Sequence, residues 1–188
     1  MVRRRGDALR GAIHTAVLDE LADFGYAGLS IERVAERART GKASIYRRWP
    51  SRLDLVLDAL DHTLPTPGDV SDTGDVRADL LTVLQRIATV MRSRDGDAAR
   101  ACLGPDVDEE LRNAIRVRLL APRRAALLAV LRRAAERGEV RAEAVTERIA
   151  EVGPMLLHGE LLQRGLIDDD AVVAIVDEVL MPLLRVQR

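Results

Sequence analysis

The sequence predicts an all-α protein of about nine helices. Apolar residues recur at the three- and four-residue spacing of helices in one segment after another, and no segment alternates as a strand would. Charge divides along the chain: residues 1–52 carry 11 Lys+Arg and 6 Asp+Glu, a balance of +5, whereas the remaining 18 Lys+Arg and 24 Asp+Glu give −6. We therefore expect a three-helix helix-turn-helix domain over residues 1–50 and a larger helical domain over residues 51–188.

The composition indicates a globular protein that can bury a core, since 47% of its 188 residues are hydrophobic and 31% are charged. The single Cys102 excludes an internal disulfide and is typical of a reducing cytoplasm. No apolar run follows Arg3-Arg4-Arg5 that would serve as a signal peptide, and none approaches the length of a membrane span. We expect a cytoplasmic protein without a membrane partner.

The first helix is predicted over residues 7–24, where Gly25 ends it by entering the left-handed conformation cheaply. His14 lies one step from the apolar stripe and is interpreted as a surface or boundary residue. Residues 1–6 form a basic arm, which is either a mere terminus or a contact to phosphates or the minor groove. The predicted buried stripe of this helix comprises Leu9, Ile13, Ala16, Val17, Leu21 and Phe24.

Residues 28–52 predict two short helices joined by a turn. Ser30 precedes the first and is placed to cap it, and Ile31, Val34, Ala35 and Ala38 share one face. A break follows at residues 39–41, and the second helix then runs through Arg48 with Ile45 and Trp49 facing inward. Its other face carries Lys42, Ser44, Arg47 and Arg48. A narrow basic helix after such a turn is typical of a recognition helix in the major groove of DNA.

This stretch resembles the TetR family of bacterial transcriptional regulators. The resemblance rests on Gly25-Tyr26, Leu29-Ser30, Val34-Ala35, the run from Lys42 to Tyr46, and Trp49-Pro50-Ser51-Arg52. It is weaker in the C-terminal part, at Pro122-Arg123-Arg124 and Arg137-Gly138-Glu139. Two positions depart from the family: Arg39 stands in the turn where glycine is usual, and Gly41 stands where serine is frequent. We expect Thr40 to take over the cap of the recognition helix.

The resemblance implies a DNA-binding regulator, most simply a repressor that leaves a near-palindromic operator when a small molecule enters the C-terminal domain. By their chemistry, Tyr46, Arg47, Arg52 and the amides near Thr40 are expected to bind phosphates. Lys42, Ala43 and Ser44 lie where base edges are reached. The predicted DNA-binding set is Ser30, Thr40, Gly41, Lys42, Ala43, Ser44, Tyr46, Arg47, Arg48 and Arg52. The alternative is an all-helical protein-interaction module that does not bind DNA.

The remaining helices follow in order along the chain. The fourth begins at Ser51, which forms a capping-box-like start with Asp54, and Pro65 stops it. Residues 65–75 are predicted to be a loop. A helix is predicted over about residues 107–120, and its apolar pattern resumes after Pro122 and extends to Gly138. We therefore expect either one long helix with a kink at Pro122 or two nearly coaxial helices. The other predicted helices cover residues 76–94, 97–103, 142–164 and 169–186.

The last helix is apolar nearly all round, so we expect a homodimer through the last two helices, about 142–164 and 169–186. Val176 or Val179 is the predicted seam. An effector would meet aliphatic walls, because all four aromatic residues lie before residue 50. We therefore expect a largely aliphatic effector, with a lining of Leu84, Ile87, Met91, Leu119, Met155 and His158. A position for His158 at the dimer seam is the alternative.

The sequence predicts neither catalysis nor a cofactor or metal. Gly41-Lys42-Ala43-Ser44 lacks the upstream glycine of a phosphate-binding loop, and no nucleophile elbow occurs. His14, His62 and His158 lie far apart along the chain. Asp168-Asp169-Asp170 precedes a predicted helix, so capping explains these carboxylates better than metal binding does.

Overall fold

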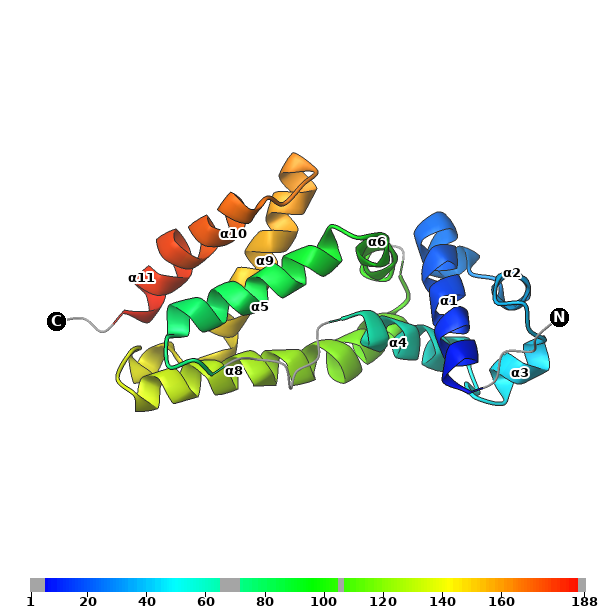
Figure 1. Ribbon diagram of the computed structural model, residues 1–188, viewed down its shortest axis with the longest axis horizontal. Coiled ribbons are helices and arrows are strands. Elements are labelled where there is room, and N and C mark those ends of the chain that lie inside the picture. The colour runs from blue at the N-terminus through cyan, green and yellow to red at the C-terminus, as the bar shows by residue number, and fades with distance from the viewer. Residues whose placement is uncertain (1–5, 65–71, 105–106, 186–188) are drawn as a thin grey trace. The chain divides into compact units, whose positions relative to one another are not determined.

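The computed structural model describes residues 6–64, 72–104 and 107–185. The regular secondary structure of these residues is all helical, with no strand among them, and when contiguous segments are joined it forms nine helices and one short 3-10 turn (Figure 1). The predicted fold class is confirmed. None of the helices in these ranges combines the length and the apolar content that a membrane crossing requires. Residues 1–5 of the basic arm predicted over residues 1–6, and most of the loop predicted at 65–75, lie outside the described residues.

Contacts divide the chain into two compact units. The first, here called the head unit, comprises residues 1–64 and 93–119, and the second, the body unit, comprises residues 65–92 and 120–188. The predicted boundary at residue 50 therefore differs from the division by packing. The fourth helix and the segment around residues 94–119 bury their apolar faces with the first three helices and not with the body unit.

The head unit is built around α1, which packs mainly against α2, α4 and α6. Gly25, at φ 68°, ends the regular part of α1 as predicted, although the helical assignment continues to Gly28. The helices of the unit are α1 (Asp7–Gly28), α2 (Ile31–Arg37), α3 (Lys42–Tyr46), α4 (Arg52–Thr63), α6 (Arg94–Ala101) and α7 (Glu109–Ala114), which continues as a π-helical stretch, η2 (Ile115–Leu120).

The core of the head unit contains the predicted apolar stripes with one exception. Ile13, Val17 and Leu21 of α1 are buried together with Val34 of α2 and Ile45 of α3. Phe24 was expected inside, but half of it (51%) is exposed. The guanidinium of Arg33 lies 4.3 Å from the centre of its ring, so Phe24 supports a polar surface instead.

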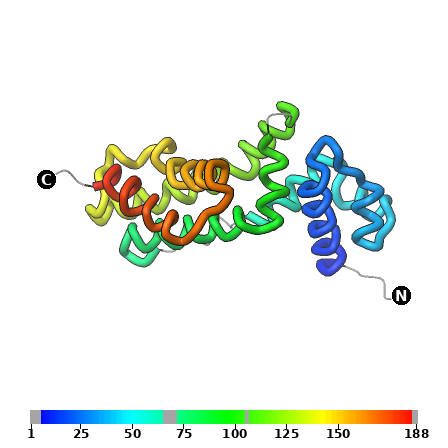
Figure 2. Tube along the Cα trace, turned by 90° about the horizontal axis from the view of Figure 1, so that it is seen from above, coloured from blue at the N-terminus to red at the C-terminus, as the bar shows by residue number. Residues whose placement is uncertain are grey.

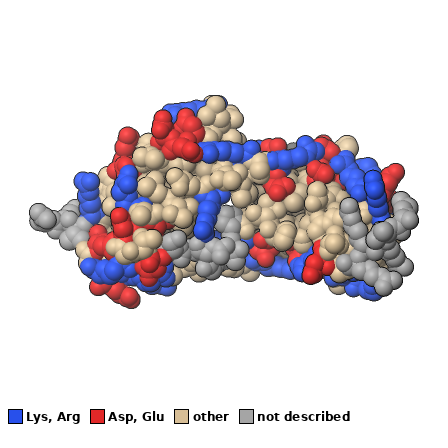
Figure 3. Space-filling view, viewed as in Figure 1, with Lys and Arg blue, Asp and Glu red and all other residues tan. Residues whose placement is uncertain are grey.

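The body unit is a helical bundle with an aliphatic core. Helix α10 and its continuation return beside α9 and pack against it and α5 (Figures 1 and 2). Acidic and basic side chains are interspersed over the face of this unit drawn in Figure 3. Its elements are α5 (Val76–Met91), α8 (Ala121–Glu136), a 3-10 turn, η3 (Ala142–Ala144), α9 (Glu147–Arg164), α10 (Asp169–Ala174), a π-helical stretch, η4 (Ile175–Leu180), and α11 (Met181–Leu184).

The predicted interruption at Pro122 is absorbed without a break in the helix. Pro122 lies in the first turn of α8, directly after the π-helical stretch η2. A proline has no amide hydrogen to donate, and a wider turn before it relieves its clash with the preceding backbone. Pro154 is likewise inside α9, which the structure assigns as one helix from Glu147 to Arg164.

Large apolar side chains are exposed on the last helices of the body unit. Met155 and Leu162, seven residues apart on α9, are 68% and 69% exposed, and Leu166 follows at 57%. Of the two residues predicted as a dimer seam, Val176 is fully buried in the core of its own unit, whereas Val179 is half-buried. An interface through these helices would therefore use Met155 and Leu162 rather than Val176.

Candidate nucleic-acid interface

The turn between α2 and α3 is built largely as the sequence predicts. The Ser30 hydroxyl caps α2 by accepting a hydrogen bond from the Arg33 amide at 3.4 Å. Arg39 occupies the left-handed region at φ 53°, the only non-glycine residue to do so among those described. Gly41 precedes α3 without a side-chain cap, so the expectation that Thr40 caps this helix is wrong.

Helix α3 presents one apolar and one polar face. Ile45 and, just beyond the helix, Trp49 are buried, while Lys42, Tyr46 and Arg47 are exposed. The Ser44 hydroxyl accepts from Arg47 at 3.4 Å, so this arginine lies along the helix surface. An open groove of about 800 Å³ runs beside this face, lined by Gly6, Leu9, Ala35, Glu36, Arg39, Thr40, Gly41, Ala43, Ser44, Arg47 and Arg48.

The first residue of α3 is tied to the first turn of α2. The Lys42 ammonium donates a hydrogen bond to a carboxylate oxygen of Glu32, and the Ser30 hydroxyl donates to the other oxygen at 3.2 Å. Chiefly because of the Lys42 hydrogen bond, the pKa of Glu32 falls to about 2, so this carboxylate is ionised at neutral pH. The one lysine of the chain is therefore paired in the absence of DNA.

Asp58 of α4 joins three parts of the head unit. Its carboxylate accepts from Trp49 Nε1 at 2.8 Å, lies 2.7 Å from His14 Nε2, and accepts from Arg10 Nη2 at 2.6 Å. Trp49 lies just beyond the end of α3, so Asp58 fixes this end of the helix against α1 and α4. His14, predicted near the surface, is only 2% exposed, because it packs between Trp49 and His62.

The protonation states of this cluster follow from its packing. Burial lowers the pKa of His14, and its hydrogen bond to Asp58 opposes this only in part. Burial tends to raise the pKa of Asp58, but hydrogen bonds from Arg10, His14 and Trp49 bring it below its usual value. Asp58 is therefore a carboxylate that accepts from Nε2 of a neutral imidazole. His14 Nδ1 is buried and has no hydrogen-bond partner among the described residues.

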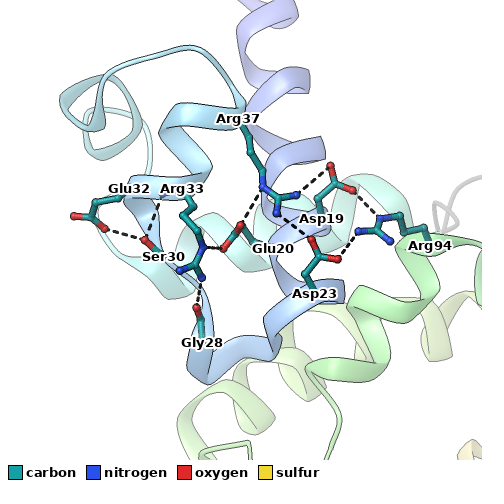
Figure 4. A network of polar contacts seen from close by, with 9 residues as sticks. All are labelled: Asp19, Glu20, Asp23, Gly28, Ser30, Glu32, Arg33, Arg37 and Arg94. Atoms are coloured by element: carbon teal, nitrogen blue, oxygen red, sulfur yellow. Dashed lines mark hydrogen bonds and ion pairs between the residues drawn. The ribbon is translucent and has the colours of Figure 1, made fainter.

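A second network holds α2 against α1 (Figure 4). Glu20 of α1 is completely buried, and its carboxylate lies 2.7 Å from Arg33 Nε and 3.1 Å from Arg37 Nε. Arg37 also donates to Asp23 at 3.0 Å, and Arg94 of α6 bonds the same carboxylate at 2.6 Å. The orientation of α2, and hence of the turn that carries α3, is set by these ion pairs and charged hydrogen bonds as well as by apolar packing.

The structure places nearly all of the predicted DNA-binding residues on one short stretch. Residues 40–48 form the turn and α3, while Ser30 caps α2 next to them. Arg52 lies at the start of α4, where its guanidinium stacks 4.2 Å from the centre of the Tyr26 ring. A stacked guanidinium keeps its hydrogen-bond donors at the ring edge, where a phosphate can approach.

The predicted effector residues are not brought together in the same way. Leu119 is buried in the core of the head unit, whereas Leu84 is buried in the body unit. Met155 faces outward, and His158 is half-buried. The cavity beside Leu84 has a volume of only about 10 Å³ and is lined by apolar residues of α5, α8, α9, η4 and α11, including Leu131, Leu180 and the backbone of Gly153. A void of this size has room for about one water molecule.

Three carboxylates that were not selected from the sequence accept most of the hydrogen bonds and ion pairs described above. They are Glu20, Glu32 and Asp58. Glu32 lies at a position that is typical of a solvated charge. One signal was present for the other two: Glu20 follows Val17 by three residues and Asp58 follows Leu55 by three, so each shares a helix face with an apolar residue. A carboxylate on a buried face requires a cationic or hydrogen-bonding partner.

Two family models match the chain. Residues 13–59 match the model of bacterial regulatory proteins of the tetR family. Residues 70–179 match a tetracyclin repressor-like C-terminal domain, which spans more than half of the chain.

Curated relatives agree with these matches along nearly the whole length. A DNA-binding transcriptional repressor TetR of Mycobacteroides abscessus is 34% identical over 188 residues, covering 96% of each chain. The HTH-type transcriptional regulator YdeS of Bacillus subtilis is 30% identical, covering 90% of this chain and 84% of its own.

Solved structures show the same architecture. The TetR family transcription regulator SCO0332 is 34% identical and superposes with a TM-score of 0.67 over 93% of this chain and 97% of its own. The fatty acid degradation regulator FadR of Bacillus halodurans has a TM-score of 0.73 over 97% of each chain, but at 17% identity it shows the fold alone.

Proposed function

Since this chain belongs to the TetR family of bacterial DNA-binding transcriptional regulators, we propose that it is a repressor that binds a near-palindromic operator as a homodimer. The observation that carries the proposal is the presentation of α3. Its apolar side is fixed by Ile45 and Trp49, and its outward side offers Lys42, Ser44 and Arg47 next to an open groove. A rigid helix with an exposed basic face can enter the major groove.

Roles within the interface follow from side-chain chemistry. Lys42, Ala43 and Ser44 reach base edges, because they open the recognition helix. Tyr46, Arg47 and Arg52 bind phosphates and set the register of the helix on the duplex. The backbone amides of Thr40 and Gly41 also bind phosphates of the DNA. The relative named a DNA-binding transcriptional repressor supports the direction of regulation.

Dimerisation supplies a second recognition helix, which binds the second half-site of the operator. A dimer through α9 and the last helix buries Met155, Leu162 and Leu166, which a monomer leaves in water. Two recognition helices related by a two-fold axis contact half-sites about 34–36 Å apart, which accounts for a near-palindromic site.

An effector regulates this dimer by favouring a body conformation in which the heads no longer match the operator. It shifts the equilibrium only by its differential affinity for the two conformations. The body unit contains no aromatic residue, because all four lie before residue 50, so the ligand is largely aliphatic. Medium-chain aliphatic acids should raise the melting temperature of the protein and release it from DNA. Tight binding of a planar cationic dye would count against an aliphatic ligand.

Selection of bound sequences from a random DNA pool tests the proposed function. We expect enrichment of one near-palindromic sequence with half-sites about one helical turn apart. A pool that remains random after several rounds, with protein shown to be folded by circular dichroism, would contradict sequence-specific binding. It would favour a helical interaction module instead.

A further inference from the structure

The ion pair between Glu32 and Lys42 spans the turn of the helix-turn-helix. Glu32 is in the first turn of α2 and Lys42 is the first residue of α3, and their side chains are 64% and 53% exposed. The second oxygen of Glu32 accepts from Ser30, which is itself held as the cap of α2. The carboxylate is therefore fixed on both sides, and it holds the ammonium at a defined place.

This pair does little for the stability of the fold. Exposed ion pairs are screened by water and salt and contribute little. The packing of α2 against α3 rests instead on Val34, Ala35, Ala38 and Ile45, which are buried. The consequence of the pair is electrostatic: it places a negative charge on the DNA-facing side and occupies one of the three N–H donors of Lys42.

A free lysine at this position would bind phosphates of any sequence, because an ammonium is a flexible point charge. A lysine held by a carboxylate behaves differently. It keeps two donors for the acceptor atoms of a base edge, while the adjacent carboxylate repels a phosphate that approaches the same place. Glu32 thus penalises non-cognate contacts more than it penalises a base contact.

Resting on the DNA-binding function proposed above, we propose that Glu32 is a specificity-determining residue, which keeps Lys42 directed at a base edge and prevents it from serving as a general phosphate contact. The pair persists in the operator complex. On unrelated DNA, Lys42 contributes no phosphate contact as long as Glu32 holds it.

The experiment compares Glu32→Gln with Glu36→Gln in the full-length dimer. Both variants remove one negative charge from α2, and Glu36 lines the groove but forms no ion pair or hydrogen bond with Lys42 in the described structure. Each protein is titrated into the selected operator and into an unrelated duplex over a range of salt concentrations. Melting by circular dichroism confirms that both variants stay folded.

We expect Glu32→Gln to bind the unrelated duplex at least about threefold more tightly and to steepen its log–log salt slope by about 0.9, one further phosphate contact. Its preference for the operator should fall at least about fivefold, consistent with one relaxed base contact. Glu36→Gln should shift both duplexes by the same factor. In a Lys42→Ala background, Glu32→Gln should no longer change the preference.

An operator preference of Glu32→Gln within twofold of the unmodified protein would overturn the proposal, and so would an equal fall in Glu36→Gln. These outcomes leave the proposed function intact, because the unmodified protein still selects its operator. If the unmodified protein does not distinguish the two duplexes, the proposed function itself fails, and the role of Glu32 fails with it.

Discussion

At the scale of single residues, the sequence was most informative where a side chain is exposed and its chemistry is local. Lys42 is the one lysine among 29 basic residues, and its position at the start of a short basic helix was predicted from pattern alone. Its partner Glu32 was not predicted. Two residues ten apart on different helices meet only through the geometry of the turn, which Arg39 shapes by its positive φ.

Lys42→Ala should lower operator affinity at least about tenfold, roughly 1.4 kcal/mol, because a base contact is lost while folding and dimerisation are kept. Lys42→Arg should not restore the affinity fully, since a planar guanidinium imposes a different geometry. Fluorescence anisotropy with labelled operator measures both. Operator binding by Lys42→Ala within twofold of the unmodified protein would refute the role of this lysine.

His14 and Asp58 show what residue-level reasoning missed. They are 44 positions apart, so their contact depends on how α1 and α4 pack, and no local pattern encodes it. The two groups also make stability depend on pH. The pKa of each is lower in the folded head than its usual value, so the unfolded chain binds more protons as the pH falls.

Stability of the head should therefore be complete above the ordinary pKa of histidine, about 6.5, and decline as the pH falls below it, first through His14 and then through Asp58. A protonated His14 would bury an Nδ1 donor without an acceptor, which adds to the loss. Urea unfolding between neutral and mildly acidic pH measures this. In His14→Asn, the loss of unfolding free energy that begins nearest neutral pH should disappear. If this variant loses stability with pH as the unmodified protein does, a group other than His14 causes the loss.

At the scale of elements, helix positions were predictable because apolar periodicity, capping residues and Gly25 act locally. Ser30, Ser51 and Asp168 cap α2, α4 and α10 as expected. The errors arise where packing decides. The short helix predicted over residues 97–103 in fact spans Arg94–Ala101, where Ser93 caps it and it packs against α1.

The end of the recognition element depends on one hydrogen bond in particular. Helix α3 has five residues and no side-chain cap, so Trp49 and its bond to Asp58 hold its C-terminal side. Trp49→Phe should reduce the free energy of unfolding by about 1–3 kcal/mol, because a hydrogen bond to a charged group is lost and ring volume decreases. Chemical denaturation checks this, with the exposed Tyr46→Phe as the control. Equal midpoints for the two variants would contradict it.

At the scale of the whole molecule, the class and the presence of a DNA-binding N-terminal domain were predictable, but the division into units was not. Sequence order suggests a boundary near residue 50, whereas the head unit takes in residues 93–119 as well. Contacts between segments far apart in sequence decide which core a helix joins. The same limitation explains Leu119, which was assigned to an effector pocket and lies in the head core.

Exposed apolar side chains locate the surface for dimerisation. Leu162→Arg should yield monomers in sedimentation experiments and weaken operator binding, because an arginine at the centre of an apolar interface is buried without a partner. Leu103→Arg is the matched control: this leucine is also exposed, but it lies in the head unit. Retention of the dimer by Leu162→Arg would place the interface elsewhere.

We propose above that this chain binds a specific DNA sequence as a dimer. The most direct measurement is the affinity of the full-length protein for its selected operator and for a scrambled duplex, each at two salt concentrations. We predict two protomers per operator, a preference for the operator of at least about 10³, and a steep loss of affinity with salt on both duplexes. Equal affinity for the two duplexes, or binding that salt does not weaken, would contradict the account.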